Sequence, residues 1–123
     1  MKAKGLVWLG TRTRKFDDTV RFFGDTLGLG MVHEEPDFAV FRLFNGDKVE
    51  VFGPGDRDQE HRSTGPVVGF LVDDVREARA DLERTGIIFI GPDHEADDGG
   101  SWSHFTGPDG NVYEITASPP AVV

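Results

Sequence analysis

The chain has 123 residues, 37% of them hydrophobic, no cysteine and a formal net charge of −9. This length suits one domain with a substantial core, and the lack of cysteine excludes disulfides and thiolate metal sites and favours a reducing cytoplasm. The acidic excess repels phosphate backbones and anionic lipids, and no apolar run reaches the roughly 20 residues of a membrane span, so we expect neither nucleic acid nor a membrane as a partner.

The first half of the chain predicts one strand, one helix and three further strands. The first strand places Trp8 and Arg12 on one face, and the helix carries apolar residues at helical spacing before Gly28, a residue typical of helix ends. The predicted elements are a strand at 7–13, a helix capped by Asp17 and Asp18, and strands at 31–34, 38–44 and 48–52.

The second half predicts the same order of elements. Asp74 caps its helix and Glu77, three positions later, completes a capping box. The elements are strands at 67–72 and 87–90, a helix ending near Gly86, an acidic loop at 91–100 whose part 92–100 could close over a site as a lid, a strand at 102–106 and a final strand after Asp109-Gly110. We therefore expect a single domain, 1–123, with module one at about 5–54, a linker at 55–65 and module two at about 66–117.

One short sequence pattern occurs twice, as FNGDKVEVF at 44–52 and as GPDGNVYEI at 107–115. Each copy joins a turn dipeptide to an alternating strand whose glutamate, Glu50 or Glu114, points away from its apolar flanks. A duplication on this scale predicts two sheets, each covered on one face by a helix. The fold class is therefore α+β, with two tandem βαβββ modules forming a curved eight-stranded mixed sheet whose helix-free face is a concave ligand pocket.

The turn dipeptides also predict which side chains share a face with the glutamates. A two-residue turn at Asn45-Gly46 places Phe41 opposite Glu50. Both plausible registers of the second hairpin place Phe105 on the face of Glu114 and His104 on the other face.

Four phrases together resemble the vicinal oxygen chelate superfamily, which includes glyoxalase I, extradiol dioxygenases and the fosfomycin and bleomycin resistance proteins. They are FDDTVRFFGDTLGL at 16–29, VEVFGP at 49–54, VGFLVDDVREARADLERTG at 68–86 and the final GPDGNVYEI. The resemblance implies the paired βαβββ fold, a small-molecule ligand in the concave sheet and a homodimer.

In metal-using members of this family, the first and last strands of each half supply the metal ligands. The last-strand positions fall on Glu50 and Glu114, but the first-strand positions fall on Trp8 and Val67, whose side chains offer no lone pair. We therefore expect no metal cofactor; if a divalent metal is present, the two glutamates hold it. The chain's histidines, expected to lie away from this site, are His33, His61, His94 and His104.

The residues favour two classes of function. An aromatic, acidic groove suits a metal-independent protein that binds, and in the most concrete case sequesters, a small aromatic or cationic compound. The expected ligand-binding residues are Trp8, Arg12, Phe41, Glu50, Phe52, Phe105 and Glu114. The alternative is an enzyme of glyoxalase type, a lyase or isomerase, or a dioxygenase, with a reduced or relocated metal site and Glu114 and Glu50 as its catalytic carboxylates, unless Arg12 pairs with one of them. In a third reading, Trp8 merely fills a collapsed pocket.

Overall fold

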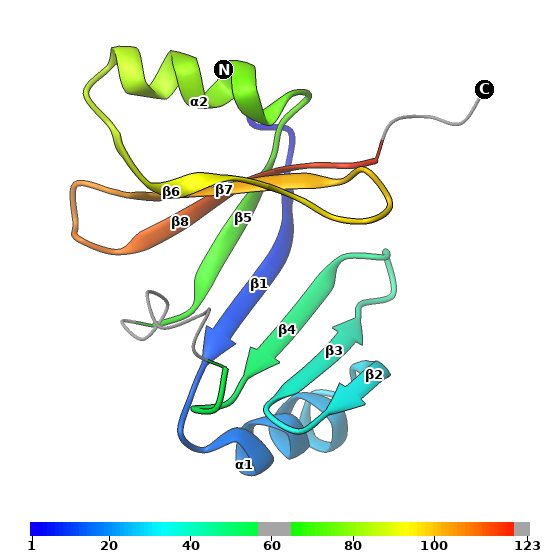
Figure 1. The fold of residues 1–123 in the computed structure, drawn as a ribbon. Coiled ribbons are helices and arrows are strands. Elements are labelled where there is room, and N and C mark those ends of the chain that lie inside the picture. The colour runs from blue at the N-terminus through cyan, green and yellow to red at the C-terminus, as the bar shows by residue number, and fades with distance from the viewer. Residues whose placement is uncertain (57–64, 120–123) are drawn as a thin grey trace. The chain divides into compact units, whose positions relative to one another are not determined.

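The computed structural model describes residues 1–56 and 65–119 (Figure 1). Most of the predicted linker, with His61, lies outside these residues. The chain divides into two compact units, Trp8–Val67 and Met1–Val7 together with Val68–Val123. Within the described ranges, no helix combines the length and apolar character that crossing a membrane requires.

The unit Trp8–Val67 is a four-stranded mixed sheet with one helix. Its strands lie in the order β2-β3-β4-β1, with β1 parallel to β4 and the other pairs antiparallel. The elements are β1 (Leu6–Arg12), which belongs to this unit from Trp8 onward, α1 (Phe16–Arg21), a π-helical turn η1 (Phe22–Thr26), β2 (Gly30–Glu35), β3 (Phe38–Arg42) and β4 (Lys48–Phe52).

Helix α1 covers one face of this sheet, and the core of the unit lies between them. Phe41 is fully buried there, and its ring lies 6.0 Å from that of Phe23 in η1. The buried strand residues of this core are Ala39, Phe41, Val49 and Val51. The helix starts earlier than its sequence predicts: Lys15 is at the N-cap, and Asp17 and Asp18 lie in the first turn. There their charge complements the helix dipole.

The other unit repeats this arrangement with its strands in the order β5-β8-β7-β6, where β5 is parallel to β8. Its elements are β5 (Val67–Leu71), which belongs to this unit from Val68 onward, α2 (Val75–Arg84), β6 (Ile88–Glu95), β7 (Ser101–Thr106) and β8 (Val112–Ala117). The predicted loop at 91–100 is wrong in its first half, because β6 continues to Glu95. The remainder is a tight turn, closed by a hydrogen bond from Ala96 N to Gly100 O of 2.7 Å.

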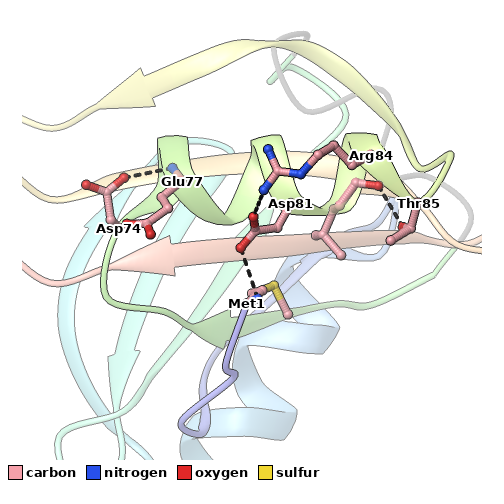
Figure 2. Close-up of polar contacts among 7 residues, drawn as sticks. Met1, Asp74, Glu77, Asp81, Arg84 and Thr85 are labelled. Carbon is pink, nitrogen blue, oxygen red and sulfur yellow. Dashed lines mark hydrogen bonds and ion pairs between the residues drawn. The ribbon is translucent and has the colours of Figure 1, made fainter.

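Helix α2 begins and ends as the sequence predicts (Figure 2). The Asp74 side chain accepts a hydrogen bond of 2.9 Å from the backbone N–H of Glu77, and Thr85 Oγ1 donates to the carbonyl of Leu82 at 2.7 Å. Helix α2 packs on Val72, Ile115 and Ala117 through Val75 and Ala78.

The first residues of the chain are grouped with this second unit by specific contacts. Lys4 N donates to Leu71 O and Leu71 N donates to Gly5 O, both at 2.8 Å. The Lys4 ammonium also pairs with Asp73, and its hydrogen bond and charge lower the pKa of that carboxyl. In Figure 2 the Met1 amine contacts Asp81 on α2 at 3.0 Å, and this hydrogen bond lowers the pKa of Asp81.

Over the described residues, both units therefore have the order strand, helix, strand, strand, strand, with eight strands in mixed pairing and one α-helix per unit. The α+β class and the duplicated βαβββ module are confirmed. The single-domain boundaries, and a pocket enclosed by both modules, stay predictions.

Candidate functional site

The two hairpins that carry the glutamates share one loop geometry, and the loop has three residues rather than two. In β3–β4, Leu43 N donates to Asp47 O at 2.8 Å and Gly46 N donates to Leu43 O at 2.9 Å. In β7–β8, Gly107 and Asn111 make the same closing contact at 2.9 Å. The glycine at the third loop position has a positive φ in both turns, 92° at Gly46 and 82° at Gly110. This is the geometry of a type I turn followed by a left-handed residue.

The extra loop residue changes the side chains that accompany Glu50. Val40, not Phe41, is opposite Glu50, and Phe41 is opposite Val49. Since a one-residue shift moves a whole strand to the other face, Phe41 joins the helix side, where it is 0% exposed. The prediction that Phe41 lies beside Glu50 is therefore wrong.

The same shift reverses the prediction for the second hairpin. His104 is directly opposite Glu114, whereas Phe105 is opposite Tyr113. Phe105 packs against the core under α2, with its ring 5.3 Å from that of Phe89. Phe105 therefore lies away from Glu114, and His104, predicted to point away, lies beside it.

In the first unit, Glu50 is held by the indole of Trp8. Trp8 Nε1 donates a hydrogen bond of 2.6 Å to Glu50 Oε1, and both side chains are half-buried. The parallel pairing of β1 with β4 sets Gly10 opposite Glu50. Because Gly10 has no side chain, the Trp8 indole, two residues along the same face, reaches the carboxylate. The short distance is that of a charge-assisted hydrogen bond.

Other groups on this face form an aromatic neighbourhood. Phe52 follows Glu50 on the same side of β4, and its ring stacks on Phe38 at 5.5 Å with a 19° interplanar angle. The Arg12 guanidinium donates to the carbonyls of Pro54 at 3.0 Å and Asp56 at 3.1 Å. Arg12 thus lies on the predicted face, and its described contacts hold the segment after β4.

In the second unit, the partner of Glu114 is an imidazole. His104 Nε2 and Glu114 Oε1 are 2.8 Å apart, and the residues are only 2% and 4% exposed. Along β7, the Trp102 ring stacks on exposed His94 at 5.4 Å and 15°. The rings of His94 and His104 lie 6.2 Å apart. Each glutamate is therefore bonded to an aromatic nitrogen within its own unit.

The register also identifies equivalent positions in the two units. Gly69 is opposite Glu114 in the parallel pair β5–β8, as Gly10 is opposite Glu50. Two residues earlier on each first strand stand Val67 and Trp8. Val67 is 1% exposed and contributes no polar atom.

These residues do not fit the metal site that the family resemblance implies. Indole donates a hydrogen bond but has no lone pair for a metal, and here it engages the carboxylate that would have served as ligand. Among the residues at 1–56 and 65–119, no three His, Asp or Glu side chains are grouped so that they could hold one ion. His104 is the nitrogen ligand nearest to a family carboxylate, and it is already bonded to Glu114.

Sequence reasoning missed His104, Val40 and the Phe38–Phe52 stack because it assigned a two-residue turn. The signal was present in the residues that flank each glycine. Asn45 with Asp47, and Asp109 with Asn111, pair across their turns through side-chain contacts of 2.8 Å and 3.1 Å. Asn and Asp side chains form such contacts with the backbone two residues on, and here they stabilise a loop of three residues.

Comparison with known proteins agrees with this architecture. The family model described as Glyoxalase/Bleomycin resistance protein/Dioxygenase superfamily matches residues 5–115. No protein with a curated description matches the chain.

Several solved structures share the fold at low sequence identity. Methylmalonyl-CoA epimerase from Mycobacterium tuberculosis has a TM-score of 0.72 at 18% identity, covering 96% of this chain and 90% of that protein. A superfamily member from Vibrio splendidus 12B01 has a TM-score of 0.66 at 17% identity, covering 89% of this chain and 96% of that one. The Mn(II)-bound glyoxalase from Novosphingobium aromaticivorans has a TM-score of 0.71 at 20% identity, covering 98% of this chain but 42% of the other. The chain therefore belongs to the Glyoxalase/Bleomycin resistance protein/Dioxygenase superfamily.

Proposed function

We propose that this chain is a metal-independent binding protein that holds a small aromatic or cationic molecule against Trp8, with Glu50 as the counter-charge. The observation that carries this proposal is the 2.6 Å hydrogen bond from Trp8 Nε1 to Glu50 Oε1. It fixes an indole ring and a carboxylate side by side on the helix-free face of the sheet. Both groups are half-buried rather than fully covered, so a ligand that contacts them loses part of its water and gains more from each contact.

The chemistry of this face selects the ligand class. A cation against an indole ring gains about 0.5–2 kcal/mol, with the larger value for a desolvated contact. The stacked rings of Phe38 and Phe52 add apolar surface that favours a flat molecule. The net charge of −9 draws cations toward the protein from a distance.

The proposed role also agrees with the donor set at the first-strand positions. Trp8 and Val67 stand where metal-using relatives carry metal ligands, and neither side chain can coordinate an ion. Family members described as bleomycin resistance proteins are named for resistance to a drug, and the family model that matches here includes them. Sequestration of such a compound is the most concrete form of the proposal.

A fluorescence titration tests it. In a Trp102→Phe variant, Trp8 is the only indole, since the chain has two tryptophans. We expect bleomycin or a planar acridinium cation to quench this fluorescence in the presence of a chelator. Glu50→Gln should weaken binding and reduce its dependence on salt, because the counter-charge is removed.

The matched control is Phe44→Ala, which removes an exposed aromatic ring in the β3–β4 loop, outside both strands. This change should leave the titration unchanged. Quenching that needs added metal, or that persists unaltered in Glu50→Gln, would argue against the proposed site.

The His104–Glu114 pair favours a second candidate, an enzyme that uses acid–base chemistry in the other unit. A buried imidazole 2.8 Å from a carboxylate is an arrangement that can position a proton.

This candidate predicts that the protein turns over a glyoxalase-type lyase or isomerase substrate without added metal, and that Glu114→Gln abolishes the turnover while leaving the fold intact. Turnover that Glu114→Gln leaves unchanged would argue against a catalytic role for this pair.

The proposal includes a homodimer, as the family resemblance implies, and a cytoplasmic location, which the absence of cysteine favours. Light scattering coupled to size-exclusion chromatography measures the mass directly. A mass near twice the 13.5 kDa of one chain is expected, and a single-chain mass across the working concentration range would rule the dimer out.

A further inference from the structure

The β3–β4 turn contains a dipeptide with a known chemical weakness. In flexible peptides, an asparagine followed by glycine loses its side-chain amide readily, because glycine has no side chain to hinder the approach of its nitrogen. The Gly46 nitrogen would attack Asn45 Cγ, forming the C–N bond of a succinimide, and ammonia would leave with the amide nitrogen. Water would then open the ring to aspartate or isoaspartate. Neither an oxidant nor a reductant is needed.

In the structure, both groups that would react are engaged in hydrogen bonds. Gly46 N, the nucleophile, donates to Leu43 O at 2.9 Å. The Asn45 side chain accepts from Asp47 N at 3.0 Å through Oδ1 and donates to Asp47 Oδ2 at 2.8 Å through Nδ2. The amide is therefore directed toward Asp47, and the attacking nitrogen is directed toward Leu43.

We propose that Asn45 is a deamidation site that the folded β3–β4 hairpin protects from reaction, and that Asp47 is the residue that provides this protection. Asn45 and Gly46 are exposed, so solvent access does not protect them. Protection comes from the geometry of the turn. The site reacts when the turn opens.

The product would disturb the face that carries Glu50. Isoaspartate routes the main chain through the former side chain and adds one carbon to a loop of three residues. The loop length fixes the register that sets Val40 opposite Glu50. Deamidation at Asn45 would therefore loosen the strand that presents Glu50. The proposal itself does not depend on the ligand-binding function, because its readout is the mass and linkage of Asn45.

The second hairpin provides an internal control. Its turn has the mirror sequence, Asp109-Gly110-Asn111, with the same cross-turn contacts: Asn111 N to Asp109 Oδ1 and Asn111 Nδ2 to Asp109 Oδ2, both at 3.1 Å. Asn111 is followed by Val112, whose branched side chain hinders attack. Asn45 and Asn111 are the only asparagines in the chain, so each peptide can be followed separately by mass spectrometry.

The experiment incubates the folded protein and a synthetic peptide of residues 40–50 at neutral pH and physiological temperature. Each hydrogen bond that must break slows the reaction about twofold to tenfold, so the folded protein should deamidate at Asn45 at least about tenfold more slowly than the peptide. Asp47→Ala should recover most of this difference. Asp47→Asn, which keeps a side-chain acceptor and the backbone N–H, should recover less.

Asp109→Ala is the matched control, since it opens the other turn and should leave the Asn45 rate unchanged. Circular dichroism verifies that each variant is folded. If Asp47→Ala does not fold, the rate in wild-type protein is measured across a urea series, where it should follow the unfolded fraction. The proposal is overturned if Asn45 deamidates as fast in folded wild-type protein as in the peptide, or if it deamidates no faster in folded Asp47→Ala than in wild type. It is also overturned if the deamidation rate does not change with urea concentration.

Discussion

The Trp8→Phe substitution tests the interaction that defines the candidate site. It keeps an aromatic ring but removes the indole N–H that contacts Glu50 at 2.6 Å, together with part of the ring area. A hydrogen bond to a charged acceptor contributes about 1.5–3 kcal/mol, and the half-buried position favours the lower end. For a chain of this length, about 1.5 kcal/mol corresponds to a melting temperature about 6 °C lower.

A double-mutant cycle with Glu50→Ala, which removes the acceptor, separates the hydrogen bond from the loss of ring area. Urea unfolding of the wild type, Trp8→Phe, Glu50→Ala and the double variant gives the coupling free energy of the pair. We expect about 1–2 kcal/mol of coupling. Trp102→Phe is the matched control for ring size, because the Trp102 contact in the structure is a stack on His94.

Independent sites add within about 0.3–0.5 kcal/mol. Coupling inside that range would show that the indole and carboxylate do not interact in solution. The assignment of Trp8 and Glu50 as one unit would then be refuted, although the fold would be unaffected.

Three further predictions concern other features of the chain. Phe41→Ala should lower the free energy of unfolding, measured in urea, by about 3–5 kcal/mol, because Phe41 is 0% exposed. Phe44→Ala should change it by no more than about 0.5 kcal/mol, because Phe44 is 111% exposed. Equal losses would contradict the three-residue loop. The hydrogen bond to Asp109 raises the pKa of Tyr113, the only tyrosine in the sequence. The stability that this contact contributes is therefore present below the pKa of the unfolded state and is lost as the pH rises through the pKa of the folded state. A tyrosinate absorbance titration should show a lower midpoint in Asp109→Asn. Trp8→His should gain zinc- or nickel-dependent heat stability, which wild type should lack at this position.

The sequence predicted the fold well because its signals are local and repeated. Gly28 and Gly86 end their helices with positive φ angles of 74° and 93°, and Asp74 caps α2 through the predicted contact. Hydrophobic alternation placed Glu50 and Glu114 opposite the helix-covered faces. Each of these features depends on a few neighbouring residues.

The site was predicted less well because it depends on register, which one loop residue decides. The assumed two-residue turn assigned Phe41 and Phe105 to the glutamate face and removed His104 from it. The structure reverses all three placements through a single cause, the extra residue before a left-handed glycine. Trp8 was placed correctly on the Glu50 face, but its hydrogen bond joins β1 to β4, which are distant in sequence.

The most direct test of metal-independent binding is a thermal-shift screen of planar cations against metal-stripped protein, run beside protein supplied with nickel, zinc, manganese and iron. A ligand at a hundred times its Kd stabilises the folded state by about 2.7 kcal/mol, which such a screen resolves. We predict that the same compounds raise the melting temperature equally in both samples. Stabilisation confined to the metal-supplied samples would contradict the proposal.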